Sequence, residues 1–330
     1  MTPDFENLVF SGAGVLGISY LGLLDYLYGQ DLIHNFGRVA GTSAGAISAT
    51  LTSFNLPFEE LKSMSDSLEY SKIPEKDSSE TSRVISPHTR YELDRIFDNF
   101  DCVFRLIKRY GWYSSNYFYS WMQKQIASQF DASLKLPPYT FADFMDNTLH
   151  KDQRPFKELY IIGTDVSRST SSVFSYETTP LMEVAEAVRI SMSIPLFFEA
   201  IKSTCEAAAP HTQPRIYSDG GLLYTYPITL FDDITPPNRT LGSFIKSVST
   251  PAPINNLLDF ISQIISCTTT IQYNTYKSDS INPFRTIEIN TEGVSPMNFD
   301  IVPDDDTYNY LYNQGFTSAE NFMRNLSNPS

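Results

Sequence analysis

Two glycine-rich turns, each lying between a short apolar segment and a helical segment, constrain the fold of this chain more than any other feature. Leu8–Phe10 is apolar and runs into a glycine-rich turn, after which Ile18–Tyr28 carries leucines at helical spacing. Gly37–Ala40 has the character of a strand end, and Gly41–Gly45 leads from it into an Ala/Ile/Leu-rich helix over 46–53. Two successive strand–turn–helix units favour an α/β fold on a parallel sheet.

Apolar runs further along the chain continue this architecture. Residues 159–163 are continuously apolar, which predicts a central strand buried on both faces. Arg215–Tyr217 predicts a strand that leads into Asp219. The remaining predicted elements are strands at 172–176 and 286–289 and helices over 181–191, over 254–271 and from about 304.

The stretch from about 59 to 150 interrupts this pattern. Residues 71–90 are rich in Ser, Glu, Lys and Pro and predict a surface loop, whereas 96–130 are dense in aromatic residues and predict helices. Because no linker divides the chain, we expect one domain over residues 1–330 with a helical insertion at about 59–150. The aromatic segment 100–121 is consistent with a lid, with a membrane-docking face, or with a subdomain that packs its rings inward.

Charge and cysteine usage exclude several classes of partner. The chain has 24 basic and 38 acidic residues, a net charge of −14, whereas nucleic-acid binding relies on Lys and Arg that neutralise phosphates. We therefore expect no nucleic-acid partner. Cys102, Cys205 and Cys267 are scattered without metal-ligand spacing, so we expect neither a structural metal nor a disulfide framework.

The N-terminal residues lack the pattern of a secretory signal. Met1–Glu6 is acidic, and only three strongly apolar residues follow before the first glycine. The uncharged stretches 7–24 and 39–58 are interrupted by Gly, Ser, Thr or Pro, unlike a membrane-spanning helix. We expect a cytoplasmic protein, with transient membrane association or export without such a signal as alternatives.

The sequence Gly41-Thr42-Ser43-Ala44-Gly45 has the form of a nucleophile elbow. The two glycines permit a tight strand-to-helix turn on which the Ser43 hydroxyl is presented, and the helix that follows points backbone N–H groups at a developing oxyanion. The alternative is a turn of small residues without a function.

The loop Gly12-Ala13-Gly14-Val15-Leu16-Gly17 has two functional interpretations. As G-x-G-x-x-G it matches the dinucleotide-binding fingerprint, which also needs an acidic residue at the end of the second strand. Asp31 lies at the right separation but does not end a strand. In the favoured interpretation the loop donates backbone N–H groups to an oxyanion beside Ser43.

A serine nucleophile needs a base. None of the four histidines follows Asp219, so the usual Ser–Asp–His order leaves only Ser43–Asp165–His211, and His211 lies in an Ala/Pro-rich loop. Asp219 is the better candidate, because it ends a predicted strand and precedes Gly220 and Gly221. The histidines are His34, His88, His150 and His211.

Taken together, these motifs resemble the patatin-like phospholipases. That family combines an N-terminal glycine-rich oxyanion loop, a G-x-S-x-G elbow and a distal Asp-Gly-Gly or Asp-Gly-Ala, which correspond here to 11–17, 41–45 and 219–221. Residues 189–195 also resemble the family segment R-x-S-x-S-x-P. The resemblance covers about two-thirds of the chain and leaves most of 59–150 uncovered.

The resemblance implies a three-layer α/β/α domain with a mostly parallel sheet and a Ser–Asp dyad, with Ser43 as nucleophile and Asp219 as general base. It also implies hydrolysis of fatty-acyl esters of phospholipids or lysophospholipids at a membrane or micelle surface, without a metal or organic cofactor. The implied oxyanion donors are Gly12, Ala13, Gly14 and Ala44, supported by Gly17, Gly41, Gly45, Gly220 and Gly221.

The chain departs from many family members at two positions. Ala13 replaces a third glycine, and Leu16 replaces a basic residue that would assist an anionic head group or the oxyanion. Alternatives are therefore a neutral-lipid lipase or acyltransferase of the same fold, or a catalytically silent binding module. No motif identifies a protein or small-molecule activator.

Overall fold

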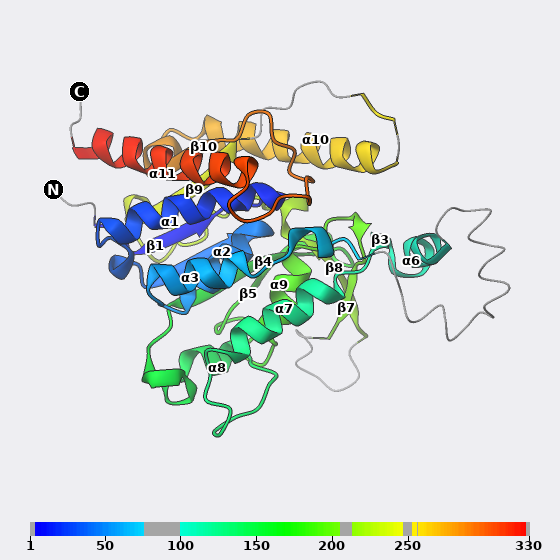
Figure 1. The fold of residues 1–330 in the computed structure, drawn as a ribbon, viewed down its shortest axis with the longest axis horizontal. Coiled ribbons are helices and arrows are strands. Elements are labelled where there is room, and N and C mark those ends of the chain that lie inside the picture. Colours follow the sequence, from blue (N-terminus) through cyan, green and yellow to red (C-terminus); the bar gives the residue numbers. More distant parts are fainter. Residues whose placement is uncertain (1–3, 76–99, 205–212, 247–252, 256, 328–330) are drawn as a thin grey trace.

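The computed structural model describes residues 4–75, 100–204, 213–246, 253–255 and 257–327, and its centre is one mixed sheet (Figure 1). The strand order is β10-β9-β1-β2-β4-β8-β7, with β5 also paired to β4. The first five of these strands are mutually parallel, whereas β8 and β5 run antiparallel to β4, and β7 antiparallel to β8. The strands are β1 Asn7–Phe10, β2 Arg38–Thr42, β4 Glu158–Asp165, β5 Thr170–Phe174, β7 Ile201–Ser203, β8 Arg215–Asp219, β9 Thr240–Lys246 and β10 Thr286–Asn290.

Apolar groups cover both faces of this sheet, as the predicted parallel α/β fold requires. Leu8 and Phe10 of β1 face one core with several helices, whereas Val9 between them faces a second core, because successive side chains of a strand point to opposite faces. Tyr226 and Tyr276 belong to that second core. The first core includes residues of α1 Ser19–Gly29, α2 Ala44–Ser53, α3 Phe58–Asp66, α9 Val184–Ser191 and α11 Asp306–Ser327; α10 Leu257–Ser278 carries Tyr276.

The stretch from 59 to 150 contributes short elements around the edge of the sheet. The uniform helical content predicted for 96–130 is wrong at 111–113, where β3 pairs with β6 in a small second sheet. A Cβ on Gly111 would lie 2.0 Å from the Phe198 carbonyl oxygen, so the side-chain-free backbone permits this pairing. After α3, the α-helices and strands described in this stretch are α6 Phe100–Arg109, β3 Gly111–Tyr113, α7 Asn116–Ala127 and α8 Phe141–Met145, and β6, the partner of β3, is Leu196–Phe198. The single-domain assignment with an insertion stays a prediction.

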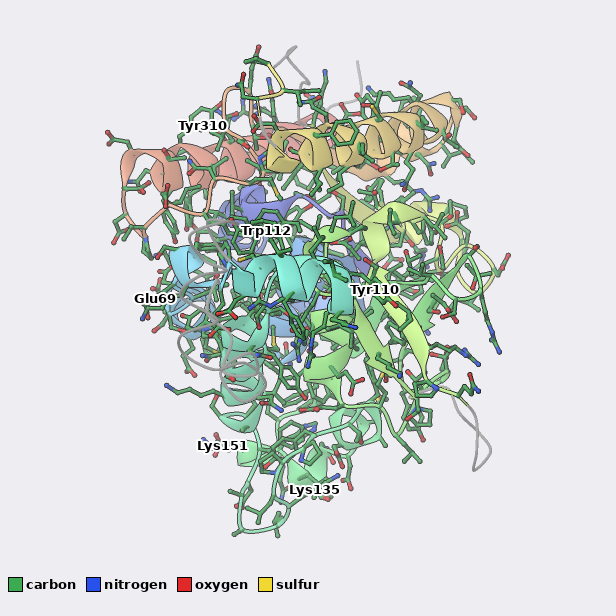
Figure 2. The ribbon with its side chains drawn as sticks, turned by 90° about the vertical axis from the view of Figure 1, so that its right-hand side faces the viewer. Glu69, Tyr110, Trp112, Lys135, Lys151 and Tyr310 are labelled. Carbon is green, nitrogen blue, oxygen red and sulfur yellow. The ribbon has the colours of Figure 1, made fainter. Side chains whose placement is uncertain are left out.

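Most described aromatic residues of the segment 100–121 pack inward. Tyr113, Phe118 and Trp121 are buried, whereas Ile107 and Tyr110 are exposed at the end of α6, and Figure 2 shows Tyr110 on the face that carries α6. Packing inside the fold therefore accounts for the larger part of this aromatic cluster.

The other predicted elements agree with the structure apart from their ends. The largest omission is β9, which lies between β1 and β10 and was not predicted. Most of the Ala/Pro-rich loop around His211 and most of the predicted loop at 71–90 lie outside the described residues. Among the helices that the structure describes, none is long and apolar enough to cross a membrane.

Candidate active site

Strand pairing brings Ser43, at the carboxyl end of β2, close to Asp219, at the carboxyl end of β8. Thr42 at the end of β2 is in register with Ile162 of β4, and the next residue, Gly163, is in register with Asp219 of β8. The Ser43 hydroxyl donates a hydrogen bond to Asp219 Oδ2 at 2.7 Å. Two residues that are 176 positions apart in the sequence thus form a buried serine–carboxylate pair.

Ser43 occupies a strained backbone conformation between β2 and α2. Its φ of 54° and ψ of −123° lie in a region that non-glycine residues rarely adopt, as in a nucleophile elbow. The turn is too tight for side chains beside it. A Cβ on Gly41 would lie 2.1 Å from the Gly45 carbonyl oxygen, and one on Gly45 would lie 2.5 Å from the Phe10 carbonyl oxygen.

A second serine fixes the backbone of the elbow. The Ser43 N–H donates to Ser191 Oγ at 2.8 Å, and the Ser191 hydroxyl donates in turn to the Ile162 carbonyl oxygen at 2.5 Å. Ser191 is fully buried at the end of α9. The sequence placed this residue in the segment 189–195 without a role, and the structure shows that it joins the elbow to β4.

Asp219 is a buried carboxylate whose partners are hydrogen-bond donors. Its Oδ1 accepts the Gly221 N–H at 2.6 Å, and its backbone N–H donates to the Ser193 carbonyl oxygen at 2.8 Å. No ion pair between described residues includes it. Burial raises the pKa of Asp219 from 3.8 to about 7, while the hydrogen bonds from Gly221 and Ser43 act in the opposite direction. A carboxyl group with this pKa is suited to accept and return a proton near neutral pH.

The glycine-rich loop lies against the elbow. The Gly12 N–H is already engaged, because it donates to the Thr225 carbonyl oxygen at 2.9 Å, so in this conformation it is not available to an oxyanion. The described hydrogen bonds of turns and loops include none from the N–H groups of Ala13, Gly14 or Ala44. Gly14 has a φ of 57°, and a Cβ there would lie 2.3 Å from the Pro296 carbonyl oxygen.

The remaining glycines of the three motifs are close-packing positions. A Cβ on Gly17 would lie 2.8 Å from Ala44 Cβ, and a Cβ on Gly220 would lie 2.3 Å from the Ile162 carbonyl oxygen. One on Gly221 would lie 2.9 Å from Asp219 Oδ1. Side chains at these positions would push the loop, the elbow or the carboxylate out of place.

The alternative site residues lie elsewhere or serve structure. The buried Asp165 carboxylate is 3.4 Å from the Arg215 guanidinium, and the Ser43 hydroxyl donates to Asp219 instead. His211 lies outside the described residues. Asp31 follows α1 as an exposed residue paired with His34, and not at a strand end as a dinucleotide site requires.

A small apolar cavity adjoins the loop and the elbow. Its volume is about 30 Å³, and Gly14, Gly17 and Ala44 form the wall nearest to Ser43. The other lining residues come from α1, α2 and the segment around α3: Leu21, Leu24, Ile47, Ser48, Leu51, Leu61, Ser65 and Tyr70. Leu16, at the position where many patatin-like proteins carry a basic residue, is buried.

Comparison with known proteins agrees with this geometry. The model of a family described as patatin-like phospholipase matches residues 8–232, which include the loop, the elbow and the aspartate motif. The chain is 24% identical to an uncharacterized protein of Acanthamoeba polyphaga mimivirus over 98% of this chain and 96% of that protein. It is also 24% identical to the probable lipid hydrolase 463L of Invertebrate iridescent virus 6, over 68% of this chain and 63% of that protein.

Among solved structures, the fold is similar to that of VipD from Legionella pneumophila. The match has a TM-score of 0.58 and 16% sequence identity, and it covers 98% of this chain and 67% of that chain. At 16% sequence identity, this similarity shows the fold alone.

Proposed function

The chain belongs to the patatin-like phospholipase family, and on that premise we propose that it hydrolyses fatty-acyl esters of phospholipids or lysophospholipids through a Ser43–Asp219 dyad. The observation that carries the proposal is the 2.7 Å hydrogen bond from the Ser43 hydroxyl to Asp219 Oδ2. The strained backbone at Ser43 and the raised pKa of Asp219 support it.

In the proposed acylation step, Ser43 Oγ attacks the ester carbonyl carbon while its proton passes to Asp219. The tetrahedral intermediate collapses, the bond to the alcohol oxygen breaks, and Asp219 returns the proton to that oxygen. Water then attacks the acyl-enzyme with Asp219 again as the base, and the fatty acid leaves. Burial matters here, because a pKa of about 7 makes Asp219 a stronger base than an exposed carboxylate while a substantial fraction of it stays ionised at neutral pH.

We assign the oxyanion to the N–H groups of Ala13, Gly14 and Ala44. Ala44 is the first residue of α2, so the partial positive charge of the helix N-terminus adds to its N–H. Gly12 is excluded as a donor while its N–H bonds to Thr225, and its role is to let the loop approach, since a Cβ there would lie 3.2 Å from Ser43 Cβ. Removing one oxyanion donor costs about 10²–10³ in rate.

The cavity beside the loop is the proposed entry for the acyl chain. An ester oxygen bound at Ala44 and Gly14 places the carbonyl carbon next to the walls that these residues share with the cavity. Leu21, Leu24 and Leu51 give it apolar walls that suit methylene groups. At about 30 Å³ it holds only the first part of a chain, so a long acyl group requires the side chains of α1 and α3 to move apart.

Covalent labelling and lipid hydrolysis together test the proposal. We expect a fluorophosphonate probe to label wild-type protein on Ser43, identified by peptide mass spectrometry, and wild type to release fatty acid from micellar phospholipid or lysophospholipid. Ser43→Ala should abolish both signals. Ser63→Ala, which changes an exposed serine of α3, is the matched control and should behave as wild type.

Three results would contradict the proposal. Labelling of a different serine would remove Ser43 as the nucleophile. Hydrolysis that survives in Ser43→Ala would have the same meaning. Faster hydrolysis of triacylglycerol than of either phospholipid class would instead leave the dyad in place and move the substrate to neutral lipids.

A further inference from the structure

A second cavity lies at the opposite end of β4 from the catalytic pair. Its volume is about 250 Å³, and its lining comes from the start of β4, the turn after β5 and α8, the helix labelled in the lower part of Figure 1. Tyr160 and Glu158 of the lining are three and five residues before Gly163 on β4, which at about 3.3 Å per residue places them roughly 10 and 16 Å from the level of Asp219. A ligand in this cavity therefore does not contact Ser43.

Aromatic rings and carboxylates make up most of the lining. The lining residues are Phe141, Phe144, Met145, Glu158, Leu159, Tyr160, Tyr176 and Glu177. Phe141, Phe144 and Tyr160 are buried, whereas Tyr176 and Glu177 are exposed at the mouth. The lining holds two carboxylates and no Lys or Arg, so its formal charge is −2 before neighbours are considered.

One of these carboxylates is compensated and the other is not. Glu158 Oε2 lies 3.2 Å from Arg38 Nε and accepts the Tyr160 hydroxyl at 3.2 Å. Glu177 forms no ion pair within the part of the chain that the structure describes. Burial raises the pKa of Tyr160, and the negative charges of Glu158 and Glu177 act in the same direction, whereas Arg38 acts in the opposite one.

An apolar, aromatic cavity with one uncompensated carboxylate at its mouth is complementary to a cation that has apolar surface. Aromatic faces attract ammonium groups through their quadrupole. A compact alkylammonium ion presents methyl groups to Phe141 and Phe144 and its charge to Tyr160 and Glu177. A volume of about 250 Å³ accommodates an ion of this size, whereas a metal ion would leave most of the space empty.

We propose that the cavity lined by Phe141, Phe144, Tyr160, Tyr176 and Glu177 binds a small organic ammonium ion of the alkylammonium class. This site is separate from the catalytic pair and does not depend on the proposed hydrolase activity. Glu177 supplies the charge and the tyrosines supply the π faces.

Choline and its neutral carbon isostere, 3,3-dimethylbutan-1-ol, test this proposal on the full chain. Binding is measured by isothermal titration calorimetry and by saturation-transfer NMR of the ligand methyl protons, at an ionic strength held constant with NaCl. We expect saturable millimolar binding of choline and at least severalfold weaker binding of the isostere. Glu177→Gln should weaken choline binding about tenfold, and Tyr176→Leu should weaken it severalfold.

Glu292→Gln is the matched control, because Glu292 is an exposed carboxylate outside the cavity lining. It removes the same charge and should leave choline affinity unchanged. Absence of saturable choline binding to wild type would overturn the proposal, as would equal affinity for the isostere. Equal losses of choline affinity in Glu177→Gln and Glu292→Gln would show that only the net charge of the protein matters, which would also overturn the proposal.

Discussion

Asp219 and Asp165 lie on neighbouring strands, and both are almost completely buried, but their surroundings differ in one respect. Asp165 Oδ2 lies 3.4 Å from the Arg215 guanidinium and 4.0 Å from that of Arg168. Asp219 accepts hydrogen bonds from Ser43 and Gly221 and forms no ion pair with any residue that the structure describes. The arginine contacts tie Asp165 to its neighbours in the fold, whereas burial raises the pKa of Asp219, so that this carboxyl group can exchange a proton.

The comparison explains why a chain rich in acidic residues has one good candidate base. Burial alone does not distinguish the two aspartates, since 5% of Asp219 and 1% of Asp165 is exposed. The residues of β8 that lie beside each aspartate distinguish them. The position before Asp219 on β8 is a serine that bonds to the Ser193 carbonyl oxygen, whereas Arg215 at the other end of β8 reaches Asp165.

The largest expected effect is on catalysis. Asp219→Asn removes the proton acceptor while keeping a side chain of the same size, so we expect ester hydrolysis to fall about 10⁴-fold. Asp165→Asn should keep activity within about threefold per folded molecule, because Asp165 does not contact the nucleophile. Steady-state rates on a medium-chain nitrophenyl ester, normalised to the folded fraction from circular dichroism, measure both. Similar losses of activity in the two variants would contradict the assignment of Asp219 as the general base and Asp165 as a structural residue.

The second prediction concerns stability and its dependence on pH. The unfolded Asp219 titrates near 3.9, whereas the pKa of the folded residue is about 7. Between these pH values the unfolded chain releases a proton that the folded chain retains, so stability falls as pH rises and the full cost is present above pH 7. Asp219→Asn avoids this cost. We expect it to stabilise the protein at pH 8 by on the order of 4 kcal/mol relative to its effect at pH 4.

Urea unfolding of wild type and Asp219→Asn at the two pH values measures that difference. A benefit of Asp219→Asn that is the same at pH 4 and pH 8 would mean that Asp219 is not held with a raised pKa in the folded protein.

The sequence singled out Ser43 and Asp219, which the structure joins by a hydrogen bond, but not the contacts that hold them in place. Glycines and apolar runs mark β1, β2 and β4 locally, and the Asp-Gly-Gly motif marks Asp219. The bond from Ser43 to Ser191 depends on how α9 packs under β4, and the loss of Gly12 as an oxyanion donor depends on Thr225. Ser191 lies in the segment 189–195 that resembles the family, but nothing local in the sequence predicts its contact with Ser43, and Thr225 has no such signal at all.

Strand β9 shows the same limit at the level of the fold. Its sequence, TLGSFIK, mixes polar residues and glycine with apolar ones, although six of its seven residues are buried. Thr240 tolerates burial because its hydroxyl accepts a hydrogen bond from the Asn7 side-chain amide. Gly242 is required because a Cβ there would lie 1.8 Å from the Tyr226 hydroxyl. Neighbours from distant parts of the chain make this segment a central strand, so its own hydrophobic pattern does not identify it.

The third prediction tests Asp165 as a structural tie. Arg215→Met keeps the length of the apolar stem but leaves the buried carboxylate with the more distant Arg168, so we expect a loss of roughly 3 kcal/mol in the free energy of unfolding. Arg168→Met is the matched control: Arg168 is mostly exposed and 4.0 Å from Asp165, and its removal should cost less than about 1 kcal/mol. Urea unfolding at pH 7 measures both, and equal losses would contradict the assignment of Arg215 as the main partner.

The smallest expected effect is that of Ser191, which accepts a hydrogen bond from the Ser43 backbone and so positions Ser43. Ser191→Ala leaves the Ser43 N–H without its acceptor, so the elbow loses one of the contacts that hold its strained φ. We expect kcat to fall about tenfold with KM nearly unchanged. Ser191→Thr, which keeps the hydroxyl, should recover part of the rate. Because a merely structural role would lower the folded fraction and not kcat per labelled site, counting active sites with the fluorophosphonate probe separates the two explanations. A kcat per labelled site equal to wild type would show that Ser191 stabilises the fold without positioning Ser43.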